Sequence, residues 1–328
     1  MKDLEFDSRY LNPLTDFGFH RLFGTDQGKE LLIHFLNEII REEGLITDIQ
    51  YLPTEHWGYA EHDRKAVFDL FCTTETGDYF IVEMQKAKQA YFQDRTLFYA
   101  SLPILKQAVR GEWNYKLKPV YLVAILNFVI FDEFEEDKEQ VIEYAYLTRE
   151  RRKTRYSKNL NFIFVELPKF KKTLQELKTN TDKWLFVLKN LYRLQEQPKE
   201  IGGKVFKNLF ELAELKRLTK REMGRYKKSI LDYYDVQNAL EYAREEASKE
   251  GFKRGVEEGA ERGRQEGTER GRKEGIEKGR IEGRIEGIEE VKASFLQRCL
   301  QKNTPVEDII SFTEFFEEQI KHYGEKGD

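Results

Sequence analysis

Two acidic residues in the first third of the chain lie within apolar sequence, in a pattern that can bind a metal ion. Asp69 falls in the apolar run 65–74, and Glu83 falls in the next run, 78–85. Burying an ionised carboxylate costs several kcal/mol unless it is paired or bound to a cation, and two neighbouring carboxylates also repel each other. A divalent cation removes both penalties, and Mg²⁺ prefers oxygen ligands of this kind. The two runs therefore predict a metal site with Asp69 and Glu83 as ligands.

Strand geometry decides which neighbours the two acids have. Side chains alternate between the faces of a strand, so Asp69 would share a face with Val67 and Phe71, and Gln85 would share one with Glu83. This polar residue beside the second acid favours the metal site. In the alternative interpretation the acids face solvent at the rim of a sheet or pair with nearby cations, for which the sequence offers Arg64, Lys65, Lys86 and Lys88.

The apolar pattern predicts a mixed α/β domain to position these residues. Helical spacing is present at 29–41 and 90–109, where Pro103 should kink the second helix. The predicted strands are 46–52, 65–74, 78–85, 115–128, 141–148 and 160–167. The second and third strands should form a hairpin with its turn near Gly77, and the helix that follows them provides a crossover. We therefore expect a mixed sheet flanked by helices.

Three segments in this order resemble a known family. The spacing from Asp69 to Glu83-Met84-Gln85 resembles the PD-(D/E)XK nuclease superfamily. Residues 15–24 (TDFGFHRLFG), 81–85 (IVEMQ) and 92–99 (FQDRTLFY) resemble its branch of PD-(D/E)XK nuclease family transposases, which are related to the recombination-promoting nucleases. The resemblance covers about the first two thirds of the chain.

The resemblance implies a restriction-endonuclease-like fold and a metal-dependent endonuclease that hydrolyses phosphodiester bonds of DNA, in recombination or transposition. It implies that Asp69 and Glu83 bind Mg²⁺ or Mn²⁺, with the backbone carbonyl of Met84 as a third ligand. Gln85 stands where the superfamily usually has lysine. A neutral amide can orient the attacking water or bind the phosphate, but it supplies no positive charge, so we expect a lower rate or a heavier dependence on the metal.

Other residues of the matching segments are candidates for the same site. Asp16 corresponds to an early acid of the family and either reaches the metal through water or caps the helix that follows it. Arg95 and Tyr99, four apart on a helix, share a face and could contact the phosphate. The alternative for Arg95 is an ordinary ion pair with Asp94, Glu83 or another acid.

A polyanion would have to bind at local patches, because the net charge of −4 excludes a uniformly basic surface. Residues 149–172 carry nine Lys/Arg and two Glu, and 216–228 carry seven Lys/Arg and one Glu. Such patches neutralise DNA phosphates with little sequence preference, unless they are simply solvated faces. For the first patch we expect DNA contacts from Arg151, Arg152, Lys153, Arg155 and Lys158.

A glycine array distinguishes the C-terminal part of the chain. Glycine recurs at every fourth position from 251 to 287, ten times in all. Ten interior glycines cost a helix on the order of 10 kcal/mol, and the alternating charges of the array return only about 2–3 kcal/mol through i,i+4 pairs. We expect a marginal helix that orders against the nuclease domain or against another chain, which would make a homo-oligomer. The alternative is a low-complexity tether.

These patterns predict the domain organisation and exclude several classes of protein. The expected boundaries are a nuclease core at 1–175, a helical accessory region at 176–248, the glycine-repeat tail at 249–291 and short C-terminal helices at 292–328. No phosphate-binding loop, histidine cluster, cysteine pair or membrane-spanning apolar run is present, which predicts a soluble cytoplasmic protein without an ATP or zinc site. Two rivals to the nuclease remain, a weakened or inactive DNA-binding or assembly protein on a nuclease fold, and an RNase or RNA-binding module.

Overall fold

The computed structural model describes residues 8–40, 45–56, 66–108, 113–302, 304–305, 308–311, 313–314, 316 and 318. Arg64 and Lys65, two of the cations considered as partners of the acids, lie outside these residues. The chain divides into two compact units, Met1–Tyr242 and Ala243–Asp328. The finer boundaries at 175, 248 and 291 stay predictions.

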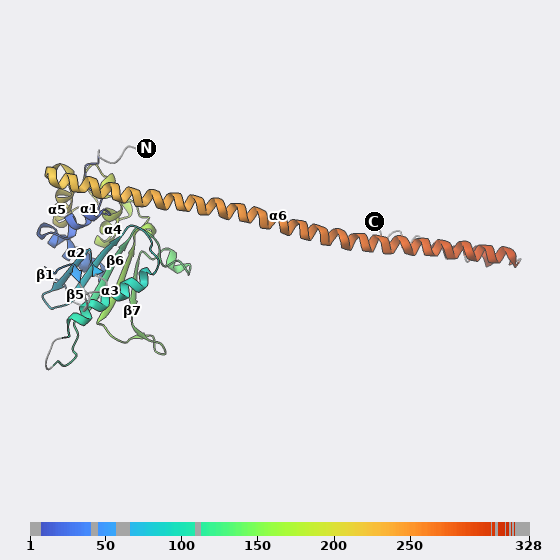
Figure 1. The fold of residues 1–328 in the computed structure, drawn as a ribbon, viewed down its shortest axis with the longest axis horizontal. Coiled ribbons are helices and arrows are strands. Elements are labelled where there is room, and N and C mark those ends of the chain that lie inside the picture. Colours follow the sequence, from blue (N-terminus) through green and yellow to red (C-terminus); the bar gives the residue numbers. More distant parts are fainter. Residues whose placement is uncertain are drawn as a thin grey trace. The chain divides into compact units, whose positions relative to one another are not determined.

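A six-stranded mixed sheet forms the centre of the first unit (Figure 1). In spatial order its strands are β1 Ile49–Tyr51, β4 Leu70–Thr74, β5 Tyr79–Gln85, β6 Val120–Leu126, β10 Leu160–Glu166 and β7 Ile142–Tyr146. The three central strands β5, β6 and β10 are parallel, and the outer pairings are antiparallel. The predicted β4–β5 hairpin is confirmed, and Gly77 in its turn has a φ of 86°, which favours glycine. The mixed α/β class is confirmed as well.

Helices cover both faces of this sheet. One face packs against α1 Asp16–Phe23, α2 Lys29–Ile39, α4 Asn180–Asn190, α5 Lys204–Ala213 and the start of α6 Lys220–Gln301. The other face packs against α3 Phe92–Lys106, which crosses from β5 to its parallel neighbour β6 (Figure 1). Phe80, Val82 and Met84 of β5 join the first core, and Ile81 joins the second. Glu83 and Gln85 therefore belong to the face that α3 covers.

The strand expected at 65–74 is interrupted. It consists of β3 Ala66–Val67, which pairs with β2 Glu55–His56, and of β4, with Phe68 and Asp69 between them. The expectation that Asp69 shares one continuous strand face with Val67 and Phe71 is wrong, since Val67 is exposed and Phe71 is buried. Each short strand pairs with a different partner, so the chain has to break where the partners change.

The strand expected at 115–128 is also shorter, because only Val120–Leu126 is extended in the sheet. Tyr115 has a φ of 58°, in the left-handed region, so the strand cannot begin at this residue. Pro119 lacks an N–H but its carbonyl accepts a hydrogen bond from the backbone N–H of Tyr79, which aligns β6 with β5.

The remaining elements are short. A two-stranded hairpin is formed by β8 Thr148–Arg149 and β9 Thr154–Arg155. Short 3-10 helices are η1 Asp26–Gly28, η2 Glu136–Lys138, η3 Leu167–Lys169, η4 Leu174–Glu176, η5 Leu191–Arg193 and η6 Leu215–Arg217.

The second unit contains the glycine array, which is helical throughout as part of α6. All ten glycines are exposed, and a Cβ added at any of them would meet nothing within 4 Å. Residues 292–301 continue α6 instead of starting a new helix, because no helix-breaking residue follows Gly287 in this stretch. Phe316, from the described part of the next helical stretch, packs its ring 6.2 Å from that of Phe295. Among the described residues, no helix is both long and apolar enough to cross a membrane.

Candidate active site

Asp69 and Glu83 lie side by side at one end of the β4–β5 hairpin. The strand register pairs Leu70 with Val82, which brings the preceding Asp69 opposite Glu83. The backbone N–H of Asp69 donates a hydrogen bond to Glu83 Oε1 over 3.2 Å, and the backbone N–H of Met84 donates to Asp69 Oδ2 over 2.7 Å. The Glu83 carboxylate is thus held by the backbone just before β4, and the Asp69 carboxylate by the backbone of β5.

Burial makes the ionised forms of these two acids costly. Glu83 is only 4% exposed, and its pKa is raised first by desolvation and then by the charge of Asp69. Asp69 keeps exposed surface, although protein atoms crowd its carboxyl group, and its pKa is also raised by desolvation. The hydrogen bond from Met84 and the charges of Lys86 and Arg95 oppose the rise at Asp69. We expect the pKa to be raised more at Glu83 than at Asp69, because the Glu83 side chain is more completely removed from water.

Gln85 contacts the second acid directly. Its side-chain Nε2 donates to Glu83 Oε2 over 3.0 Å, so the amide orients this carboxylate. The Met84 carbonyl is also well placed. The N–H and C=O of one residue point to the same side of a strand, and the Met84 N–H points to Asp69, so the carbonyl faces the same side.

Asp16 reaches the site through an ion pair. Its Oδ1 lies 2.7 Å from Lys86 Nζ, and its charge contributes to the raised pKa of Asp69. The interpretation of Asp16 as a helix cap is wrong, because the N-cap of α1 is Thr15, whose hydroxyl accepts from the N–H of Gly18. Gly18 has to be glycine here, since a Cβ would lie 2.0 Å from the carbonyl oxygen of Asn12.

Arg95 and Tyr99 flank the acids from α3. The guanidinium carbon of Arg95 lies 5.3 Å from the Phe92 ring centre and 5.7 Å from that of Tyr99, and its Nη1 donates to Gln89 Oε1 over 2.6 Å. Its charge lowers the pKa of Glu83, although desolvation dominates there. Arg95 Nη2 is buried and has no hydrogen-bond partner among the described residues. The alternative ion pair of Arg95 with Asp94 or Glu83 is not formed in the described part of the chain.

The donor set fits a hard divalent cation. Within the described part of the chain, no Lys or Arg forms an ion pair with Asp69 or Glu83, and no group of three or more His, Cys, Asp or Glu side chains comes together. Two carboxylates and a backbone carbonyl are oxygen ligands, and Mg²⁺ typically takes one or two carboxylates and completes its octahedron with water and substrate phosphate. The sequence suggested Lys86, which directly follows Gln85, only as a partner for Asp69 and Glu83, whereas it pairs with Asp16. The contact of Gln89 with Arg95 was not predicted.

The predicted DNA-binding residues lie elsewhere. Arg151, Arg152 and Lys153 form the tip of the β8–β9 hairpin, which links the end of β7 to the start of β10. The start of β10 pairs with the start of β6, whereas Glu83 pairs with Ala124 near the other end. The hairpin and the acids are therefore at opposite ends of the sheet, and the structure does not bring them together.

Part of the wider basic patch is structural. Arg155 stacks over Tyr146, with its guanidinium carbon 4.0 Å from the ring centre, and also bonds to Asn161. Lys169 forms a buried ion pair with Glu166 over 2.5 Å. Lys172, which also belongs to the patch 149–172, pairs with Asp182 over 2.6 Å, while Lys158 is exposed.

A family model described as PD-(D/E)XK nuclease family transposase matches residues 13–243. The chain belongs to this family. The resemblance of the three segments is thereby confirmed, and the match spans the sheet, helices α1 to α5 and the start of α6. No curated protein and no solved structure matches the chain. Membership of the PD-(D/E)XK nuclease family transposases indicates a nuclease or transposase type of function, with DNA as the substrate.

The raised pKa values predict how stability depends on pH in the metal-free protein. A carboxyl whose folded pKa is raised stabilises the fold fully below its unfolded pKa and loses that contribution as pH rises through the folded pKa. The loss of stability should therefore begin at the ordinary pKa values of 3.8 for an aspartate and 4.5 for a glutamate, and continue as the pH rises. In EDTA, we expect the melting temperature to fall between pH 4.5 and 8.5 more steeply for the wild type than for Glu83→Gln. Parallel pH profiles for the two proteins would contradict this.

Proposed function

We propose that this chain is a Mg²⁺- or Mn²⁺-dependent DNA endonuclease, acting in recombination or transposition. The observation that carries the proposal is the pair of Asp69 and Glu83, which lie together with raised pKa values and without an ion-pair partner among the described residues. A fold that keeps such a pair gains nothing from it in stability, so a bound cation is the physical reason for its presence.

The residues of the site divide the work of phosphodiester hydrolysis. Asp69, Glu83 and the Met84 carbonyl would hold the cation, which when bound neutralises charge on the phosphoryl oxygens and lowers the pKa of a water molecule. Gln85 keeps the Glu83 carboxylate in one orientation through its 3.0 Å hydrogen bond. Arg95 would bind a phosphate oxygen once its guanidinium turns outward, since its Nη2 is buried but has no hydrogen-bond partner among the described residues. It supplies positive charge that the neutral Gln85 does not.

Tyr99 and Asp16 act as positioning residues. The Tyr99 ring packs 5.1 Å from that of Phe68 and lies beside the Arg95 guanidinium, which restricts where that cation can move. Asp16 holds Lys86 next to the acids through the 2.7 Å ion pair.

Nicking of supercoiled plasmid DNA tests the proposal. Cleavage should appear with Mg²⁺ or Mn²⁺, disappear with EDTA, and be lost in Asp69→Ala and Glu83→Ala. Asp94→Asn, which removes an exposed acid of α3, is the matched control and should cleave normally. Cleavage that survives both alanine substitutions would remove the assigned site. Metal-independent DNA binding without cleavage would favour the inactive assembly protein, and selective degradation of RNA would favour the RNase.

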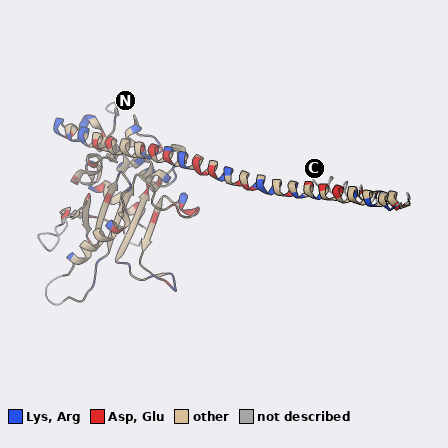
Figure 2. Ribbon diagram, turned by 45° about the vertical axis from the view of Figure 1, so that its right-hand side comes forward, with Lys and Arg blue, Asp and Glu red and all other residues tan. Residues whose placement is uncertain are grey.

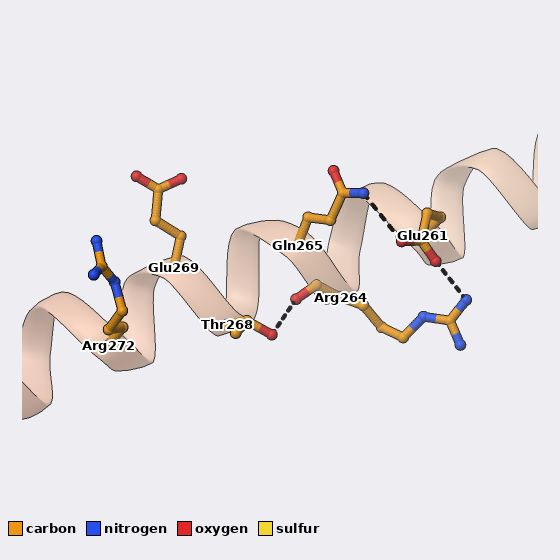
Figure 3. Close-up of a pocket in the computed structure, with 6 residues that line it drawn as sticks. All are labelled: Glu261, Arg264, Gln265, Thr268, Glu269 and Arg272. Carbon is orange, nitrogen blue, oxygen red and sulfur yellow. Dashed lines mark hydrogen bonds and ion pairs between the residues drawn. The ribbon is translucent and has the colours of Figure 1, made fainter.

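We further propose that the glycine array makes the protein a homo-oligomer. The array lies beyond the family match, which ends at residue 243. Some of its charged residues form contacts within the helix (Figure 3). Arg264 forms an ion pair with Glu261 at 2.8 Å, and Gln265 donates a hydrogen bond to Glu261 over 3.0 Å. The exposed glycines allow a second helix to approach closely, and rows at i, i+4 spacing pack at a crossing angle of about −50°.

Charge decides the orientation of such a pair. Basic and acidic residues alternate every four positions from Arg254 to Glu282. An antiparallel second copy crossing near residue 268 would place Arg270 opposite Glu266 of the other copy, whereas a parallel copy in register would place like charges together. We therefore favour the antiparallel arrangement.

Replacing Gly263, Gly267, Gly271 and Gly275 by alanine separates helix stability from association. Each substitution should stabilise the helix by about 1 kcal/mol, because the added Cβ would meet no atom within 4 Å apart from the adjoining backbone of its own helix. The same Cβ atoms should block close approach of a second helix. We expect higher helicity by circular dichroism together with a smaller mass by sedimentation equilibrium. Unchanged association of the variant would rule out contact through the glycines.

A further inference from the structure

We propose that the DNA backbone is bound by a row of three cations on the first turns of α6, formed by Arg221, Arg225 and Lys228 and called here the α6 cationic row. The inference rests on the proposed function and concerns where the substrate lies. It replaces the β8–β9 hairpin as the main phosphate contact. Lys and Arg gather on the first turns of α6 (Figure 2).

Helix geometry puts the three cations on one side of α6. They are spaced four and three residues apart, and residues at these spacings are neighbours on a helix surface. All three are exposed, while Tyr226 and Ile230 on the opposite side are buried in the core. The α6 cationic row therefore faces solvent while the helix that carries it is firmly attached.

Contacts with α1 connect the row to the residue that pairs with Lys86. The guanidinium carbon of Arg225 lies 5.8 Å from the Phe17 ring centre, and the Phe17 N–H donates to Ser229 Oγ over 3.0 Å. Phe17 follows Asp16, which pairs with Lys86 beside the active-site acids. One helical segment thus connects the row to the residues of the site.

The same helix continues to the end of the sheet that holds the acids. Gln237 Nε2 donates to the carbonyl of Lys86 over 3.4 Å, directly after β5, and Asn127 Nδ2 donates to Tyr233 Oη over 3.4 Å, directly after β6. The helix rises 1.5 Å per residue, so Arg225 precedes Gln237 by about 18 Å along the axis. DNA advances about 3.4 Å per nucleotide on each strand, so a handful of nucleotides spans this distance.

The acids near the row offset only part of its charge. The neighbouring acid Glu222 is held by Arg21, at 2.8 Å, and by the N–H and hydroxyl of Thr219, and the charge of Arg225 acts on it as well. Asp232 lies one turn beyond the row on the same side of α6. Its negative charge offsets one of the three positive charges, so this side of the helix stays positive. The β8–β9 hairpin carries three exposed cations as well, Arg151, Arg152 and Lys153, but at the far end of the sheet. The chain therefore offers a matched control of equal charge.

Salt-dependent binding of duplex DNA in EDTA tests the inference without cleavage. The probe is a labelled duplex of about 30 base pairs, followed by fluorescence anisotropy from about 50 to about 200 mM KCl. Arg221→Gln/Arg225→Gln/Lys228→Gln should weaken binding at least about 10-fold at the lower salt and reduce the slope of log K against log salt by about 2 to 3. Arg151→Gln/Arg152→Gln/Lys153→Gln should stay within about threefold of the wild type.

The controls separate this inference from the proposed function. Arg225 packs on Phe17, so a second variant, Arg221→Gln/Lys228→Gln, removes only the two cations without a ring contact and should still reduce the slope by about 2. Asp94→Asn, at an exposed acid of α3, should bind with the wild-type slope. A larger loss for the hairpin variant, equal losses for both, or tighter binding of an RNA duplex would overturn the inference, even if the protein cleaves DNA. A protein that never cleaves but shows the expected slopes would refute the endonuclease alone.

Discussion

Glu83→Gln is expected to lose DNA cleavage and to unfold at a higher temperature than the wild type. The carboxylate is needed for the metal, whose stabilisation of the transition state is worth several kcal/mol, so the rate should fall at least about 100- to 1,000-fold. The same carboxylate is 4% exposed and lies beside Asp69, so its ionised form weakens the fold. A neutral amide of the same shape removes both penalties.

The hydrogen bonds of Glu83 should survive this substitution. The oxygen of the new amide can still accept from the N–H of Asp69, and Gln85 can turn its own amide to accept from the new NH₂ group. At pH 8 in EDTA, we expect the melting temperature to rise by about 2–4 °C for each kcal/mol gained. Tryptophan fluorescence, to which the buried Trp184 contributes, can follow the transition. The exposed Asp94→Asn should change neither property, and a Glu83→Gln protein that melts earlier would show that the acid is structural.

Mg²⁺ should stabilise the wild-type protein strongly and leave the acid variants unchanged. A ligand that binds only the folded state at 100 times its dissociation constant adds about 2.7 kcal/mol. For a unit of this size that corresponds to a rise of roughly 5–10 °C in melting temperature. The gain in melting temperature should be largest near pH 8, because both carboxyls must be ionised to bind Mg²⁺. It should be absent in Asp69→Asn/Glu83→Gln.

Ionic strength is the main confounding factor in this measurement. Matched concentrations of KCl control for screening of the surface charges, which Mg²⁺ would also change. A shift of equal size in the double variant would mean that the cation acts elsewhere on the protein. That result would remove the metal site while leaving the family membership intact.

Local signals in the sequence predicted the part of the site that depends on one hairpin. Alternating apolar residues and the turn at Gly77 determine the pairing of β4 with β5, and that pairing brings Asp69 opposite Glu83. The sequence predicted both acids as neighbours because only 14 positions, within a single hairpin, separate them. The interruption before β4 could not be foreseen, since it arises from the change of partner between β3 and β4.

Residue types and spacing in the sequence predicted the mixed α/β class and the hairpin with its two acids, and the resemblance of three segments predicted the family. The tertiary structure alone decided that Thr15 caps α1, that Asp16 pairs with Lys86, and that α6 lies along α1. It also decided that Lys169 is a buried structural cation and that the basic hairpin lies far from the acids. The physical reason is distance along the chain. Strand alternation and tight turns are encoded within a few residues, whereas the partner of a surface charge depends on segments up to about 200 positions away, which only packing brings together.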